Sequence, residues 1–148
     1  MRSSRKQAIL EQFRHGMIVS CQALEDEPLH GAHIMSAVAR AAELGGAVGI
    51  RANSPPDIAA IKRTVRVPVI GLYKKTYADS DVLITLTMRE VHEIVAAGAD
   101  LVAIDATFQP RPNGERFEDI VAHIRDAYPD VLIFADVSTC EEGLRAME

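Results

Sequence analysis

The chain has 148 residues, of which 48% are hydrophobic and 25% charged, and its formal net charge is −5. This balance is typical of one folded domain, and the acidic charge argues against a nucleic-acid partner, which needs clustered Lys and Arg. No run approaches the roughly 18 apolar residues of a membrane span, and the basic start lacks the apolar stretch of a secretory signal. We therefore expect a cytoplasmic protein with no membrane partner and free thiols at Cys21 and Cys140.

An opening helix is predicted for about residues 4–15, ahead of five short apolar runs. The runs are rich in Val and Ile and barely alternate between apolar and polar residues. Strands that are buried on both faces of a parallel sheet have this composition. In chain order the predicted strands span residues 17–22, 47–52, 67–73, 101–107 and 131–137.

The four segments between these runs carry apolar residues at helical spacing. Thr87 and Glu90 have the spacing of a capping box, and a further helix is predicted to begin at Ser138 or Thr139. The predicted buried faces are Ile34, Val38 and Ala41; Ile58, Ile61 and Val65; Val91, Ile94 and Val95; and Phe117, Ile120, Val121 and Ile124.

This alternation of strands and helices predicts an α/β fold, for which two architectures fit. An open, doubly wound five-stranded parallel sheet is complete at about 150 residues, so length favours it. The other is the (β/α)8 TIM-barrel type, which typically needs about 250 residues and would be present as about five βα units. The helical pattern interrupted at Glu148 favours the incomplete barrel. We expect residues 1–148 to form one partial domain, with residues 1–16 as a helix covering the barrel bottom.

Each predicted strand ends in a hydrogen-bonding or ionisable side chain. Ligands bind at the carboxyl ends of strands in both architectures, so these side chains predict a ring around a polar ligand. Side chains alternate along a strand, so only one of two adjacent lysines faces the mouth, and Lys74 is the better candidate. The same rule makes Cys21 a packed thiol. The ring consists of Gln22, Arg51, Lys74 with Lys75, Asp105 and Asp136.

These groups suit proton transfer at a carbon next to a carbonyl. A lysine partly withdrawn from water beside Arg51 could act as the base, and the arginine could hold an enolate or sugar hydroxyls. A structural ion pair between Lys74 and Asp136 explains the same residues, and spacing alone slightly favours it. His30 and His33 lack a carboxylate at ligand spacing, so no metal site is predicted.

Five short motifs follow one another in the chain: MIVSCQALEDEPL, AVGIRAN, PVIGLYKK, LVAIDAT followed by PRP, and FADVSTCEEGL. In this order, from about Met17 to Gly143, they resemble the motifs of the bacterial N-acylglucosamine-6-phosphate 2-epimerases. The resemblance implies a (β/α)8 barrel that interconverts N-acetylmannosamine 6-phosphate and N-acetylglucosamine 6-phosphate in sialic-acid catabolism.

The resemblance implies that Lys74 is a catalytic acid/base and that Gln22, Arg51 and Asp136 bind a phosphorylated amino sugar. We add Asp105, from the ring, to the substrate-binding set. No cofactor is implied, because the C1 aldehyde of the open-chain sugar acidifies the proton at C2.

Family members continue with strands six to eight, which carry a partner glutamate and a glycine-rich phosphate site. We therefore expect low activity from the isolated chain, and association as a homo-oligomer (a dimer) or through exposed barrel edges. Two other functions stay open: a non-catalytic doubly wound binding or regulatory domain, and a sugar-phosphate lyase or isomerase barrel with a Schiff-base lysine.

Overall fold

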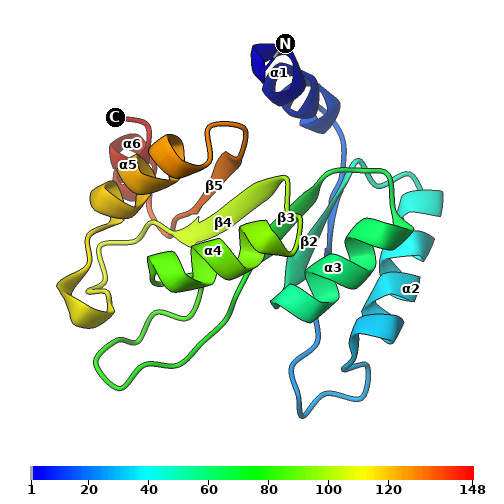
Figure 1. The fold of residues 1–148 in the computed structure, drawn as a ribbon, viewed down its shortest axis with the longest axis horizontal. Helices are drawn as coiled ribbons and strands as arrows, with labels where there is room; N and C mark the ends of the chain where they lie inside the picture. Colours follow the sequence, from blue (N-terminus) through cyan, green and yellow to red (C-terminus); the bar gives the residue numbers. More distant parts are fainter. Residues whose placement is uncertain (1) are drawn as a thin grey trace.

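Five parallel strands lie side by side in the order in which they occur in the chain (Figure 1). The computed structural model describes residues 2–148. All five predicted strands are present, each shorter than its apolar run. They are β1 (Ile18–Cys21), β2 (Gly49–Asn53), β3 (Val69–Leu72), β4 (Leu101–Asp105) and β5 (Leu132–Asp136).

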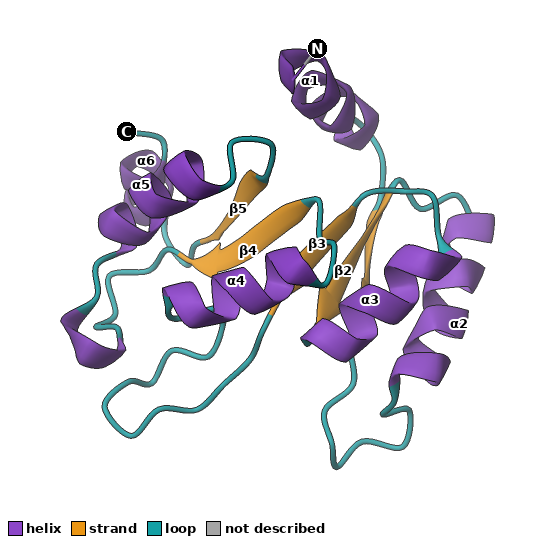
Figure 2. Cartoon of the chain, viewed as in Figure 1, coloured by secondary structure: helices purple, strands orange, loops and turns teal. Residues whose placement is uncertain are grey.

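Helices fill the connections between strands, as predicted (Figure 2). The opening helix begins and ends two residues earlier than predicted. Thr87 and Glu90 form the predicted capping box of α4, and Thr139 caps α6 in the same way with Glu142. The helices are α1 (Arg2–Phe13), α2 (Ala32–Leu44), α3 (Pro55–Thr64), α4 (Met88–Ala96), α5 (Phe117–Ala127) and α6 (Cys140–Ala146), with a short 3-10 turn, η1 (Pro112–Gly114).

The strand order decides between the two predicted architectures. A doubly wound sheet reverses its strand order at a switch point and carries helices on both faces. Here each strand pairs with its neighbours in sequence, from β1 to β5 without a reversal. This is the arrangement of consecutive βα units in a barrel, so the barrel-type prediction is confirmed and the doubly wound alternative is wrong.

The two faces of the sheet bury different clusters. Helices α2 to α5 pack against one face, where buried Cys21 joins side chains such as Ile50, Ile58 and Ile104. The predicted packing of the Cys21 thiol is therefore confirmed, and burial raises its pKa. On α2, however, Ala41 is exposed, and Met35 and Ala39 are the fully buried residues. The packed stripe of α2 is thus centred one residue later than predicted.

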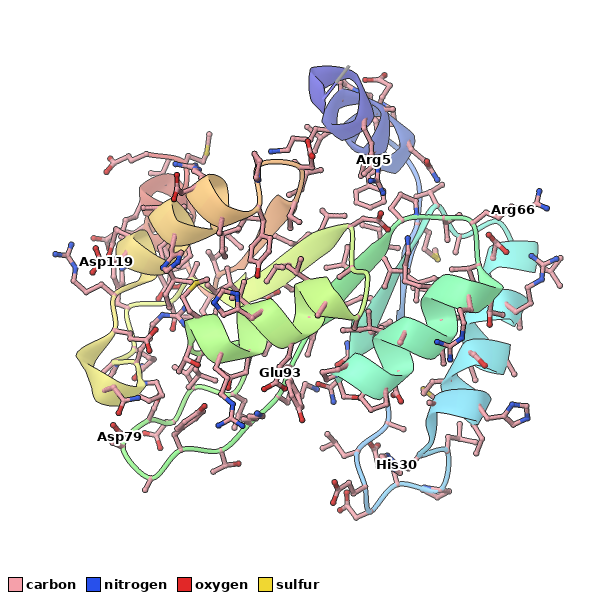
Figure 3. The ribbon with its side chains drawn as sticks, in the orientation of Figure 1. Arg5, His30, Arg66, Asp79, Glu93 and Asp119 are labelled. Carbon is pink, nitrogen blue, oxygen red and sulfur yellow. The ribbon has the colours of Figure 1, made fainter. Side chains whose placement is uncertain are left out.

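The other face carries a smaller cluster that α1 reaches. Ile9 is buried there with Ile70, Leu72 and other side chains of β3 and β4. Arg5 projects from α1 toward the sheet (Figure 3) and donates a hydrogen bond to Asp100, at 2.6 Å, just before β4. These contacts place α1 at the amino ends of the strands. The division into residues 1–16 and one partial domain stays a prediction.

Gly71, in the middle of β3, lies where the packed helices leave no room for a side chain. A Cβ there would lie 2.6 Å from a methyl of Ile94 and 2.9 Å from both Ala99 and Ile58. We expect Gly71→Ala to lower the free energy of unfolding by about 1–3 kcal/mol, because overpacking a filled core forces its neighbours to move. Urea unfolding followed by circular dichroism measures this loss.

The matched control is Gly143→Ala in α6, where the nearest atom outside the helix backbone is a Val137 methyl at 3.9 Å. Alanine favours a helix over glycine by up to about 1 kcal/mol, so this variant should be as stable as the wild type or more stable. Equal stability of the two variants would contradict the packing argument at Gly71.

Candidate active site

An ion pair joins two of the predicted site residues across the sheet. Both terminal nitrogens of Arg51 donate to the carboxylate of Asp136, each at 2.7 Å, and the Arg51 guanidinium lies 5.5 Å from the ring centre of Phe134. Arg51 belongs to β2 and Asp136 to β5, three strands away. In a flat sheet three strand spacings are about 14 Å, so the sheet must curve to bring these ends together.

This pair also settles the alternative in which Lys74 and Asp136 form a structural ion pair. Asp136 binds Arg51 instead, so that interpretation is wrong. Both partners are half-buried, and the guanidinium keeps N–H donors beyond the two that the carboxylate occupies. The ion pair therefore lies on the concave face of the sheet, and the remaining N–H groups of the guanidinium can donate hydrogen bonds to a ligand.

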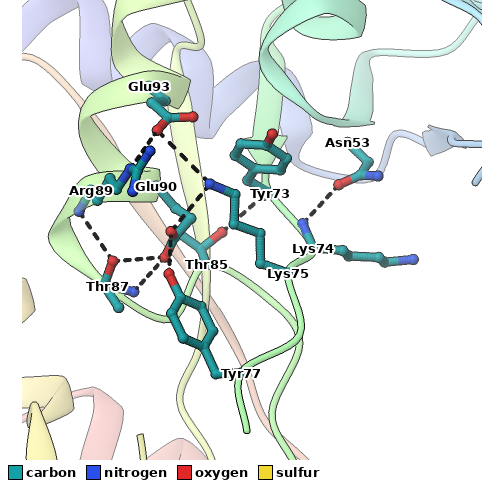
Figure 4. A network of polar contacts seen from close by, with 10 residues as sticks. All are labelled: Asn53, Tyr73, Lys74, Lys75, Tyr77, Thr85, Thr87, Arg89, Glu90 and Glu93. Atoms are coloured by element: carbon teal, nitrogen blue, oxygen red, sulfur yellow. Dashed lines mark hydrogen bonds and ion pairs between the residues drawn. The ribbon is translucent and has the colours of Figure 1, made fainter. Parts of the chain in front are cut away.

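The two adjacent lysines after β3 have different surroundings (Figure 4). The ammonium of Lys75 lies 3.6 Å from Glu90, 3.9 Å from Glu93 and 4.3 Å from the ring centre of Tyr73. The backbone N–H of Lys74 donates to the side-chain oxygen of Asn53 at 2.9 Å. Among the residues that the structure describes, the Lys74 ammonium makes no ion pair, and Figure 4 shows it pointing away from Lys75.

Backbone pairing holds the two lysines apart. The N–H of Lys75 donates to the carbonyl of Leu83, and the N–H of Thr85 donates to the carbonyl of Tyr73, each at 3.0 Å. The segment 73–75 is therefore extended, so consecutive side chains point to opposite sides. One lysine is held against α4 by carboxylates, and the other is left available beside the strand ends.

Glu90 is the centre of the network beside Lys75, and the sequence interpretation assigned it only a capping role. Its carboxylate is fully buried and accepts from the Tyr77 hydroxyl at 2.7 Å and from the Thr87 backbone N–H and hydroxyl at 2.9 and 2.8 Å. Burial raises the pKa of Glu90, but these hydrogen bonds and the Lys75 charge lower it by more, so its pKa lies below the ordinary value. A sequence signal existed, because Glu90 precedes buried Ile94 by one helical turn.

Gln22 and Asp105 are the other two residues of the predicted ring, and each uses only part of its side chain in hydrogen bonds within the fold. The amide nitrogen of Gln22 donates to the Ser20 hydroxyl at 2.7 Å, while its oxygen is buried and has no partner among the described residues. One carboxylate oxygen of Asp105 accepts from the backbone N–H and the hydroxyl of Thr107, at 2.9 and 2.7 Å. Asp105 therefore closes the turn after β4 and has one oxygen left for a ligand.

Arg111, in the PRP motif, fastens the loops that follow β3 and β4. It is buried and donates to the carbonyls of Thr85 and Leu86, at 3.2 and 2.9 Å, and to the carbonyl of Asp105. Burial lowers the pKa of Arg111, and the charge of Asp105 opposes that shift. The role of Arg111 is to hold the segment that pairs with Tyr73 and Lys75.

A cavity of about 500 Å³ opens at the carboxyl ends of β1, β2 and β3. It brings Lys74 together with Asn53, which the sequence interpretation missed although it lies two residues beyond Arg51. In residues 2–148 no three His, Cys, Asp or Glu side chains gather as a metal site. The cavity lining consists of Ala23, Leu24, Glu25, Asp26, His30, Ala32, Asn53, Ser54, Pro56, Asp57, Tyr73 and Lys74.

A parallel sheet in chain order, with polar side chains at the carboxyl ends of its strands, defines the class of βα-barrel proteins. Residues 35–148 match the model of the NanE family, described as "Putative N-acetylmannosamine-6-phosphate epimerase". The chain belongs to this family.

Similar proteins have related names. Proteins named "Putative N-acetylmannosamine-6-phosphate 2-epimerase" from Listeria innocua and Caldanaerobacter subterraneus are 53% and 52% identical over 135 and 138 residues. These matches cover 91% and 93% of this chain and 58% of each relative. The solved N-acetylmannosamine-6-phosphate 2-epimerase of Clostridium perfringens superposes with a TM-score of 0.90 at 45% identity, over 94% of this chain and 60% of that one.

The chain thus spans about three fifths of the length of the relatives that it matches. None of the helices in residues 2–148 has the length and hydropathy that a bilayer crossing needs.

Proposed function

We propose that the chain acts in the interconversion of N-acetylmannosamine 6-phosphate and N-acetylglucosamine 6-phosphate, by removing and returning the proton at C2. The observation that carries the proposal is the Lys74 ammonium, which has no ion-pair partner in the described residues and lines the cavity of a chain in this family. Its neighbour Lys75 is occupied by Glu90 and Glu93, so Lys74 is the lysine available for chemistry.

The proposed step begins with the open-chain sugar, whose C1 aldehyde acidifies the C2 proton. The Lys74 amine takes that proton, and the electron pair moves toward the C1 oxygen as an enolate. Arg51, held rigid by Asp136, offers donors to the developing negative charge or to sugar hydroxyls. A second acid, which the family resemblance implies is the partner glutamate of strands six to eight, would then donate a proton to the opposite face of C2 as the enolate electron pair returns from the C1 oxygen, and this gives the epimer.

Gln22 and Asp105 are proposed as substrate contacts. The unpartnered oxygen of Gln22 would accept a sugar hydroxyl, and the second carboxylate oxygen of Asp105 would do the same. Each contact would use an acceptor that the fold leaves open.

The proposal also covers location and assembly. We propose a cytoplasmic protein that forms a homo-oligomer (a dimer) or associates through its sheet edges. Within residues 2–148, β1 and β5 each have a strand neighbour on one side only, and Met17 and Val137 beside them are 71% and 43% exposed. Unpaired strand edges and exposed apolar side chains favour association.

Proton exchange in deuterated water tests the proposed function. The chain is incubated with N-acetylmannosamine 6-phosphate, and proton NMR follows the loss of the C2 signal and the appearance of the epimer. We expect exchange above the buffer rate but low activity, because the chain spans about three fifths of its relatives. Exchange no faster than in buffer contradicts the proposal. A sugar adduct on Lys74 after borohydride treatment would favour the Schiff-base alternative.

A further inference from the structure

A smaller cavity lies beside the loop that follows β4, where Arg145 of α6 meets the start of α5. Its volume is about 170 Å³, and it shares no lining residue with the cavity that contains Lys74. Phe117, in its wall, belongs to the buried cluster on the helix-covered face of the sheet. The proposed proton transfer gives this cavity no role, although three arginines line it: Arg111, Arg116 and Arg145.

The Arg145 guanidinium is held in place in this wall and has an unmet donor. Its Nη2 donates to the carbonyls of Ala106 and Thr107, at 2.7 and 3.1 Å, and its central carbon lies 4.4 Å from the ring centre of Phe108. Its Nε is buried and has no hydrogen-bond partner among the described residues. The Glu118 carboxylate lies 3.9 Å from this Nε, which is too long for a hydrogen bond. Buried donors are almost always paired, so the Nε–H indicates a ligand.

Arg111 adds a second positive charge that no carboxylate contacts directly. It is 7% exposed, and within residues 2–148 its hydrogen bonds go to backbone carbonyls and it forms no ion pair. Burial lowers the pKa of Arg111 and the charge of Arg145 lowers it further, whereas Asp105, Glu115 and Glu118 oppose the shift. A buried charge is normally compensated by an opposite charge. Two positive charges beside one cavity, one of them almost fully buried, therefore favour an anion there.

The acidic side chains of the cavity, Glu115 and Glu118, only partly balance its three arginines. The Glu118 carboxylate lies 3.6 Å from the Nε of Arg116 and 3.9 Å from that of Arg145, so two guanidinium groups share one carboxylate. The first turn of α5 lines the same cavity and has no side-chain cap, so its free N–H groups add positive potential. An anion in the cavity would thus face more positive than negative charge.

We propose that this cavity binds a small oxyanion of phosphate size, with the Nε–H of Arg145 as a donor and the buried charge of Arg111 beside it. Guanidinium groups match the spacing of phosphate oxygens, and their hydrogen bonds to anions are strong. The volume of about 170 Å³ is below the roughly 300–1,000 Å³ of cavities that enclose whole organic ligands, so it suits a small ion. A bound anion would stabilise the loop after β4, because Arg111 also donates to the carbonyl of Asp105. The inference is independent of the proposed function.

NMR of the ¹⁵N-labelled chain tests the site, with inorganic phosphate added at constant ionic strength against chloride. We expect saturable shifts in the backbone N–H signals of residues 107–111 and 115–118 and in the Arg145 Nε–H signal, but not in those of Asn53 and Lys74. Acetate, with a single charge, should bind at least about fivefold more weakly than phosphate. Glycerol 3-phosphate distinguishes the sources: if it shifts the same signals, the site accepts the phosphate group of an organic ester, and otherwise it takes the free ion.

Arg145→Met removes the unmet donor and should weaken phosphate binding at least about tenfold, because a charge-assisted hydrogen bond is lost. The matched control is Arg125→Met, at an exposed arginine in the last turn of α5, which should change the affinity less than about twofold. If circular dichroism shows that Arg145→Met does not fold, Glu118→Gln replaces it. That variant keeps every arginine and removes a negative charge beside the Arg145 Nε, so it should tighten phosphate binding about two- to tenfold.

Three results would overturn the anion site. Shifts that rise with phosphate without saturating would show charge screening alone. A saturable response confined to the cavity with Lys74 would place the ion elsewhere, and an equal loss of affinity in Arg145→Met and Arg125→Met would show that only total charge matters. None of these measurements follows exchange at C2, so the anion site and the proposed function can each fail without the other.

Discussion

Replacing Lys74 with methionine is expected to lower the rate of C2 hydrogen exchange by about 10²–10⁴-fold, the usual contribution of a positioned acid or base, if Lys74 is the proposed base. Methionine retains much of the length and apolar character of the lysine stem and removes only the basic nitrogen. Because the Lys74 ammonium makes no ion pair in the described residues, the fold should be unaffected. Proton NMR in deuterated water measures the rate, and circular dichroism confirms that the variant is folded.

Lys75→Met is the matched control for this experiment. The Lys75 ammonium is held between Glu90 and Glu93 and packs on Tyr73, so it has little reason to reach the substrate. We expect less than a tenfold change in exchange per folded molecule, together with some loss of stability from the unpaired Glu90. If Lys75→Met loses more of the exchange rate than Lys74→Met, the proposal that Lys74 is the base is wrong.

Glu90→Gln is expected to destabilise the chain by about 2–3 kcal/mol, the cost of disrupting a buried, charged hydrogen-bond network. Glutamine cannot accept at both positions that Tyr77 and Thr87 now occupy, and it has no charge for Lys75. Urea unfolding at pH 7 measures the loss. Glu93→Gln, one turn away and partly exposed, should cost no more than about 0.5 kcal/mol.

The difference between wild type and Glu90→Gln should also depend on pH. The folded pKa of Glu90 is lower than in the unfolded chain, so the charged carboxylate adds stability that is fully present above the ordinary glutamate pKa of about 4.3. As pH falls through the folded pKa, that contribution is lost and the two proteins approach each other in stability. A difference that grows on acidification would show that burial, not hydrogen bonding, controls this carboxylate.

Local patterns were enough to predict the elements of the fold. Apolar runs identified β1 to β5, and the spacing of Thr87 and Glu90 predicted the start of α4, because burial and capping depend on residues close in sequence. On α2 the same reasoning chose Ile34 and Val38 over their neighbours Met35 and Ala39, since adjacent apolar residues make a helix face ambiguous by one position. Neither strand order nor sheet curvature has such a local signature.

The sequence by itself thus determined the succession of βα units and the polar residue at the end of each strand. Only the tertiary structure decided which of those residues meet. Curvature of the sheet pairs Arg51 with Asp136, and the return of residues 83–85 beside β3 separates Lys74 from Lys75. These are contacts between distant segments, and their energies depend on packing that short sequence patterns do not encode.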